Sequence, residues 1–247
     1  MNKRKTVYWA PWFVPQESHH WNMLFIEPQK LFNKIIKEVS TTSDDRLKAM
    51  IRCPAFSNLG KNTFYVENPI TTEFNIIDGE IKYNGDNFYH CTLSNSFNHM
   101  YGSSYSETNT FKYGLSYIFF SEYDLEILMT APYFSEVNHT NYAKLVPGKF
   151  NISKWFRPIN LEMILNGDKN YFKMSEYEHM AYFSFLTNDK VELKRFELND
   201  TLRKISDTCS TVSDWWSNVP LLERYDRFLK TKTNRLVMKE IRKQLVE

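Results

Sequence analysis

The chain has 247 residues, and its 42% hydrophobic content is enough to build a core in one large domain or two small ones. Its 31 Lys and Arg residues nearly balance its 29 Asp and Glu residues, so the chain as a whole has no electrostatic field that would attract a polyanion. The three cysteines lie far apart without a Cys-x-x-Cys spacing, which argues against a disulfide framework and a zinc site. No signal peptide and no apolar run of about 20 residues is present, so we expect a soluble protein that is not secreted and has no membrane partner.

The N-terminal region predicts an extended segment followed by a helix. Residues 6–26 place several aromatic side chains around two prolines, a pattern that favours an extended chain wrapped over the domain. Pro28 then stands where a helix begins, and apolar residues recur at three- and four-residue spacing as far as Val39. This spacing predicts a helix over residues 28–40.

Short β-type runs follow. Residues 64–83 contain three of them, and Asp78-Gly79 between the last two is typical of a hairpin turn. Residues 84–109 are rich in Asn, Ser, Gly and Tyr and predict a long irregular loop. Two further strands are expected over residues 110–120 and 123–131.

The next region, residues 149–186, predicts four consecutive strands after a second loop over residues 132–148. Asn166-Gly167-Asp168 marks a turn within it. From about residue 198 the apolar spacing becomes helical again. We therefore expect a β-rich domain over residues 1–197, a sandwich or β-clip of about eight to ten strands, and a helical extension over residues 198–247. The predicted class is mainly β, α+β overall.

The two predicted loops contain the side chains that suit a ligand site. These candidates are His90, His99, His139, Tyr101 and Tyr105. No His-x-His or His-x-x-x-His spacing is present, so the sequence predicts neither a metal site nor a cofactor, and it indicates no catalytic residues. If replacing the histidines only destabilises the fold, their role is structural.

A second group of candidates is aromatic. It could form a platform for a ring or a sugar, or it could seal the end of a sheet against pairing with other chains. Its members are Trp9, Trp12, His20, Trp21, Trp155 and Arg157.

The C-terminal segment contains the one local concentration of basic residues. Contact with nucleic acid or an acidic partner is one explanation, a solvated helix face is another, and packing on a second subunit is a third. The residues that would contact nucleic acid are Arg224, Arg227, Arg235, Lys239, Arg242 and Lys243.

Residues 147–186 resemble the β-clip strands of the dUTPase and dCTP deaminase superfamily. In that superfamily a strand that carries the catalytic Asp is followed by a strand, a polar turn and a short run that leads to a final apolar strand. Here NLEMIL, Asn166-Gly167-Asp168, NYFKM and HMAYFSFL take the corresponding places. The catalytic Asp has no clear counterpart, so the resemblance does not imply nucleotide hydrolysis.

Residues 110–190 more closely resemble an uncharacterised β-rich domain family of bacteria and tailed phages. The resemblance rests on LEILMTAPYF (Leu125–Phe134), a Trp-containing strand pair over residues 149–165 and a Glu-rich turn into an apolar strand. It implies a β-rich fold and no established activity. We therefore expect a phage-encoded, non-catalytic binding or virion structural protein that acts with a protein partner or by self-assembly, in the host cytoplasm or the virion. The alternative is an enzyme or small-ligand-binding module with its site between loops 84–109 and 132–148.

Overall fold

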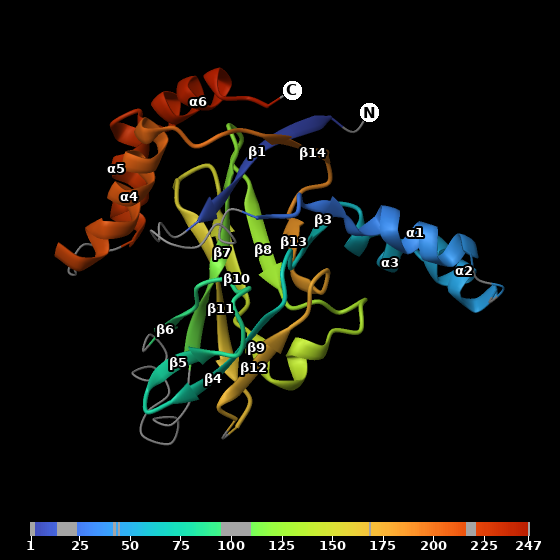
Figure 1. Ribbon diagram of the computed structural model, residues 1–247. Coiled ribbons are helices and arrows are strands. Elements are labelled where there is room, and N and C mark those ends of the chain that lie inside the picture. The colour runs from blue at the N-terminus through green and yellow to red at the C-terminus, as the bar shows by residue number, and fades with distance from the viewer. Residues whose placement is uncertain are drawn as a thin grey trace.

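A computed structural model describes residues 3–13, 24–41, 43, 45–94, 110–167, 169–215 and 221–246 of the protein. Within these ranges strands take up more of the chain than helices, so the protein is mainly β with several helices, as its sequence predicts. The strands form three sheets at the centre, and the helices lie in two groups on opposite sides of them (Figure 1).

The largest sheet brings together segments that lie far apart in the sequence. Its strand order is β14-β1-β7-β11-β9, and β6 also pairs with β7. The strands are β1 (Arg4–Phe13), β6 (Thr92–Ser94), β7 (Thr110–Phe120), β9 (Ala143–Leu145), β11 (Pro158–Leu165) and β14 (Lys190–Arg195). Strand β1 is parallel to β14 and antiparallel to β7, so it is an interior strand.

The N-terminal segment therefore differs from the wrapping chain that the sequence predicts. Residues 4–13 form β1 inside the largest sheet, and residues 14–23 lie outside the described ranges. Val7 and Trp9 face the main core, whereas Tyr8 and Ala10 face a second core beneath the C-terminal helices. Because the strand is buried on both faces, its apolar residues show no alternation that would reveal a strand.

The second sheet has five strands in the order β10-β8-β13-β3-β2. They are β2 (Gln29–Lys30), β3 (Thr63–Glu67), β8 (Glu126–Thr130), β10 (Gly148–Asn151) and β13 (His179–Phe185). Its inward side chains share one core with those of the largest sheet, and the rings of Phe119 and Phe183 lie 5.0 Å apart across it.

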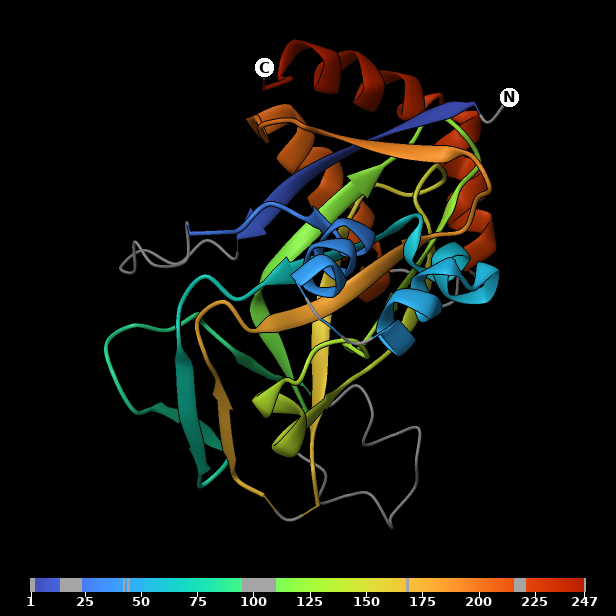
Figure 2. The same cartoon turned by 90° about the vertical axis from the view of Figure 1, so that its right-hand side faces the viewer.

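The third sheet lies at the end of the molecule away from the last helix (Figure 2). Its order is β12-β4-β5, with β4 (Thr72–Ile77), β5 (Glu80–Tyr83) and β12 (Tyr171–Met174). The predicted Asp78-Gly79 hairpin is confirmed, since φ is 52° and 75° at these residues, as a two-residue hairpin turn requires. The Asn166-Gly167 turn instead links strands of different sheets, because β11 belongs to the largest sheet and β12 pairs with β4. The rings of Phe172 and Phe74 on these paired strands lie 5.2 Å apart.

The first group of helices covers the outer face of the second sheet. It comprises α1 (Leu31–Thr41), α2 (Asp45–Arg52) and α3 (Pro54–Gly60). The helix predicted over residues 28–40 corresponds to α1, which begins later than predicted because Gln29 and Lys30 pair with β3. The predicted loop over residues 132–148 contains the short 3₁₀ helix η3 (Asn138–Asn141) and β9.

The second group of helices packs on the other side, over β1 and β7. It comprises α4 (Asp200–Trp215), α5 (Leu221–Lys230) and α6 (Thr233–Lys243). Lys232 adopts a left-handed conformation with φ of 56°, which separates α5 from α6. No helix in the described part of the chain combines the length and apolar character needed to cross a membrane.

Candidate functional site

The outer face of the second sheet carries polar side chains beneath α1. On β3 and β13, which are antiparallel neighbours, Tyr65 lies opposite Tyr182 and Glu67 lies opposite His179. These residues face away from the main core, because side chains alternate along a strand and Phe64, Val66 and Phe183 face inward. The apolar side of α1 packs on Tyr65 and Tyr182 and so buries this polar face.

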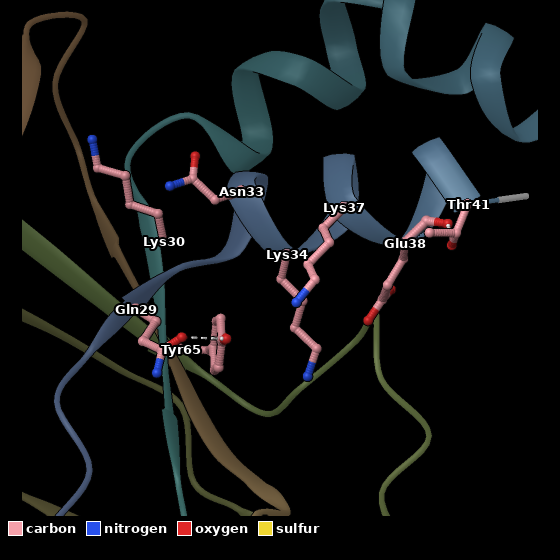
Figure 3. Close-up of a pocket in the computed structure, with 8 residues that line it drawn as sticks. All are labelled: Gln29, Lys30, Asn33, Lys34, Lys37, Glu38, Thr41 and Tyr65. Carbon is pink, nitrogen blue, oxygen red and sulfur yellow. Dashed lines mark hydrogen bonds between the residues drawn. The ribbon is translucent and has the colours of Figure 1, made fainter.

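A pocket of about 660 Å³ opens between α1, β2 and β3 (Figure 3). Three of its lining residues are lysines and one is a glutamate, so its charge is positive. The lining residues are Gln29, Lys30, Asn33, Lys34, Lys37, Glu38, Thr41 and Tyr65. Lys34, Lys37 and Glu38 extend from the same side of α1 (Figure 3).

Lys34 connects this pocket to the buried polar residues. Its Nζ lies 2.7 Å from Nε2 of His179 and 3.8 Å from Oε1 of Glu67. The Lys34 side chain is 31% exposed, whereas that of His179 is 2% exposed, so the lysine bridges solvent and interior. Burial raises the pKa of Glu67, although Lys34 opposes the shift.

His179 is held in its neutral form. Burial, and secondly the charge of Lys34, lowers its pKa to about 4. Because an ammonium group has only donors, Nε2 of His179 must accept the hydrogen bond from Lys34. The ring proton then resides on Nδ1, which lies 3.0 Å from Oγ of Ser135 and 3.1 Å from the hydroxyl of Tyr182.

Tyr65 supports the imidazole from one side. The two rings stack 4.3 Å apart at an angle of 17°. The Tyr65 hydroxyl donates a hydrogen bond to Oε1 of Gln29 at 2.9 Å, and burial together with the nearby Glu67 carboxylate raises its pKa to about 12. With both nitrogens bonded and one face covered, His179 has a fixed orientation.

A second buried pair adjoins this cluster. Nδ1 of His139, in η3, lies 2.8 Å from Oε1 of Glu178, and the backbone N–H of His139 donates to the same oxygen at 2.6 Å. The backbone N–H of Ser175 donates to the other oxygen at 2.9 Å. Burial raises the pKa of Glu178, but these hydrogen bonds outweigh it and hold that pKa below its usual value. His139 therefore joins η3 to the start of β13.

Of the other residues predicted for a site between the two loops, His90 lies in the part of the chain that the structure describes. His90 is half-buried in the segment before β6, where its backbone lies against Gly114 of β7. His99, Tyr101 and Tyr105 lie outside the described residues.

The predicted aromatic platform is divided between two cores. Trp9 is buried against Phe25 and Tyr117, and Trp155 is buried against Tyr225 and Phe228. Core packing thus accounts for both rings. Among the remaining members, Trp12 is half-buried beside the Arg203 guanidinium, Arg157 is exposed, and His20 and Trp21 lie outside the described ranges.

The predicted basic residues lie on α5 and α6. A groove of about 420 Å³ runs between α6 and the turn after β7, and Arg235, Lys239, Arg242 and Lys243 line it. Arg242 pairs with Glu122 at 2.6 Å, and Lys243 pairs with Glu240 at 2.7 Å. On α5, Arg227 pairs with Glu223 at 3.9 Å, and Arg224 is half-buried.

Lys30, Lys34 and Lys37 are not among the candidate residues that the sequence suggests, although the spacing of Lys34 and Lys37 contains a usable signal. Lys34 and Lys37 lie three residues apart on α1 and so share one side of the helix, which indicates a cationic face. Lys30 belongs to β2 and joins them only through the fold. Tyr65 and Glu67 give no such signal, because only the pairing of β3 with β13 brings them to His179.

Within the described ranges, no cluster of three or more His, Cys, Asp or Glu side chains has a geometry that could hold a metal ion. Comparison with known proteins gives no match, since no family model, curated protein or solved structure is significantly similar to this chain. The pocket beside α1 and its buried polar support are therefore the basis for inferring function.

Proposed function

We propose that this chain is a non-catalytic binding protein whose pocket beside α1 holds a small ligand bearing a phosphate or carboxylate group. The observation that carries the proposal is the position of Lys34. This residue lines the pocket, and a hydrogen bond of 2.7 Å from its Nζ to Nε2 of the buried His179 holds its ammonium group in place. Lys30 and Lys37 line the same pocket, so an anion there has three cationic groups within the lining. A positioned ammonium group loses less conformational freedom on binding than a free one.

The state of His179 favours binding over catalysis. Ser135 and His179 resemble a nucleophile and its base, because Oγ lies 3.0 Å from Nδ1. A base, however, needs a lone pair directed at the nucleophile. The hydrogen bond from Lys34 leaves the lone pair on Nε2 and the proton on Nδ1, so the ring faces Ser135 with its proton and has no lone pair there to take up the serine proton.

The proposal is tested by titrating the full chain with inorganic phosphate and with citrate, using calorimetry and thermal melting. Binding of either anion should raise the melting temperature beyond the effect of chloride at matched ionic strength. Lys37→Gln should weaken binding about tenfold, since it removes one charged contact of about 1.4 kcal/mol.

The matched control is Lys144→Gln, because Lys144 is an exposed lysine on β9 outside the pocket lining. It should leave anion binding unchanged. Equal effects of phosphate, citrate and chloride, or equal binding by the Lys37 and Lys144 variants, would refute the pocket as an anion site.

A second candidate function is contact with nucleic acid through α6. Residues 221–246 carry eight basic and three acidic side chains, although the net charge of the whole chain is only +2. Arg235, Lys239 and Arg242 line one groove at the three- and four-residue spacing of a single helix face. This local concentration of basic side chains supports contacts with phosphate groups, although the net charge of the whole chain gives no such support.

The test is fluorescence polarisation with a labelled single-stranded oligonucleotide at several salt concentrations. Affinity should fall as salt rises, and the double variant Arg235→Gln and Lys239→Gln should reduce the salt dependence. Lys144→Gln with Lys194→Gln is the control with the same loss of charge on exposed strand residues. Binding that does not respond to salt would exclude this function.

The finer architecture and the biological setting are further parts of the proposal. The shared core of the two larger sheets supports a sandwich arrangement, whereas the β-clip likeness stays a prediction. Membership of the bacterial and phage family, self-assembly, and a location in the virion or host cytoplasm also remain predictions. Size measurement of the purified chain would test self-assembly directly.

A further inference from the structure

A second pocket, of about 330 Å³, opens on the same outer face of the second sheet, where Thr63 of β3, Thr130 of β8 and Ser184 of β13 line it. Neutral polar side chains make up most of its wall. The lining residues are Asn58, Lys61, Asn62, Thr63, Leu128, Thr130, Tyr133, Ser184, Phe185, Leu186, Thr187 and Asn188. Among the described residues that line it, Lys61 is the only lysine and none is a carboxylate, so its chemistry differs from that of the cationic pocket beside α1.

Hydroxyl groups gather on the sheet side of this pocket. Ser184 lies opposite Thr63, and their hydroxyl oxygens are 2.7 Å apart. Both side chains form hydrogen bonds with the hydroxyl of Tyr133. These bonds lower the pKa of Tyr133, but burial has the larger effect and raises it. A hydroxyl both donates and accepts, so this cluster can bond groups that do the same.

Thr130 supplies an unused hydroxyl in the same wall. Thr130 belongs to β8 and lies opposite Tyr182 of β13, so its side chain is on the outer face of the sheet. Its Oγ1 is buried and has no hydrogen-bond partner among the described residues. A buried hydroxyl without a partner is unfavourable, so a ligand hydroxyl at this position would form a bond that costs Thr130 no existing hydrogen bond.

The frame around the pocket is rigid. Asn62 is 6% exposed, and its Nδ2 donates to the backbone oxygens of Thr187 and Asp189, each at 2.8 Å. Its Oδ1 accepts from the backbone N–H of Val191 at 3.1 Å. These bonds fix the chain that leaves β13 and forms one rim, so little ordering is required when a ligand binds.

Two apolar surfaces stand beside the hydroxyl cluster. Tyr133 is 43% exposed and Leu186 is 47% exposed, and both line the pocket. The rings of Tyr133 and Tyr182 pack edge to face with 4.8 Å between their centroids, which steadies the exposed Tyr133 ring. A ligand with a hydroxylated edge and an apolar C–H face would match both kinds of wall.

We propose that this pocket is a second binding site, which takes a neutral polyhydroxylated ligand such as one saccharide unit. A sugar ring offers hydroxyls that can bond Thr130 and Ser184, and C–H groups that can pack on Tyr133 and Leu186. The volume is at the lower end of the ~300–1,000 Å³ range of ligand pockets, which suits a single ring. This inference does not depend on the anion site.

The test is saturation-transfer NMR on the full chain with the methyl glycosides of glucose, galactose, mannose and N-acetylglucosamine. Transfer to the ring protons of at least one of them is expected. Thr130→Val keeps the shape of the side chain and removes the hydroxyl, so it should weaken binding about fivefold. Tyr133→Ala should abolish the transfer.

Two controls separate this site from other effects. Thr92→Val, at an exposed position on β6, should leave binding unchanged, and so should Lys37→Gln in the cationic pocket. Absence of transfer to all four glycosides would overturn the proposal. Transfer that survives both pocket substitutions, or that inorganic phosphate abolishes, would overturn it as well.

Discussion

The ammonium group of Lys34 donates a hydrogen bond to Nε2 of His179, with 2.7 Å between the two nitrogens. The contact joins a lysine at the wall of a pocket to a histidine that is 2% exposed. Burial, and secondly this contact, hold the imidazole neutral by lowering its pKa. The contact also places the ring proton on the side of Ser135 and Tyr182. A protonated His179 would bring two cations together in a buried site, so the contact should respond to acid.

The stability of the protein should therefore fall between pH 6.5 and pH 4. The pKa of His179 is about 4 in the folded protein and 6.5 in an unfolded chain. Between these values the unfolded chain binds the extra proton, so the free energy of unfolding decreases as the pH falls. The full contribution is about 3 kcal/mol. Denaturant melts at a series of pH values would measure it.

His179→Gln is the comparison variant for this pH dependence. It removes the titrating ring, so the difference between wild type and variant isolates the contribution of His179 from that of the other histidines. The difference should be largest above pH 6.5 and shrink towards pH 4. Parallel pH profiles of the two proteins would show that His179 does not cause the loss of stability.

Glu178→Gln should destabilise the protein by about 3 kcal/mol at neutral pH, because it leaves donors from His139 and Ser175 without their carboxylate. The pKa of Glu178 is lowered in the fold, so its stabilisation is present above the unfolded pKa and is lost as the pH falls through the folded pKa. Chemical denaturation at neutral and acidic pH would show the effect shrinking in acid. Glu176→Gln, at an exposed neighbouring position, should change stability by no more than about 0.5 kcal/mol.

Gly114→Ala should destabilise the fold by about 3 kcal/mol. A methyl group at this position of β7 would overlap the backbone carbonyl of His90, which cannot withdraw without moving the segment that leads to β6. Gly85→Ala, where the added methyl group meets open space, is the control and should be nearly neutral. If thermal melting gave the two variants the same midpoint, the close contact between Gly114 and His90 would be refuted.

Ile241→Ala should cost about 3 kcal/mol, the usual range for truncating a fully buried isoleucine. Ile241 belongs to the core that α6 shares with Ile118 and Phe120 of β7. Leu236 lies on the same helix and is 45% exposed, so Leu236→Ala is the control and should change the free energy of unfolding by only about 0.5 kcal/mol. Equal urea midpoints for the two variants would show that α6 does not pack on the sheet.

The sequence alone identified those elements whose patterns are local. Strand β7 has the predicted bounds of residues 110–120, and the β4–β5 hairpin forms at Asp78-Gly79, because strand propensity and turn conformation depend on neighbouring residues. The helix α1 follows its apolar spacing, although pairing of β2 delays its start. The mainly β class follows from such patterns.

Only the tertiary structure decided which strands are neighbours. Strand β1 lies between β14 and β7, far from both in sequence, and the strands on either side of Asn166-Gly167 join different sheets. The polar site depends on the same kind of pairing: Glu67 and His179 meet because β3 and β13 are antiparallel in one particular register. A register is selected by burial across the whole sheet, and a shift of one residue would move every such side chain to the opposite face. The short-range patterns of the sequence therefore define the strands, whereas long-range packing of their apolar faces determines which polar side chains meet.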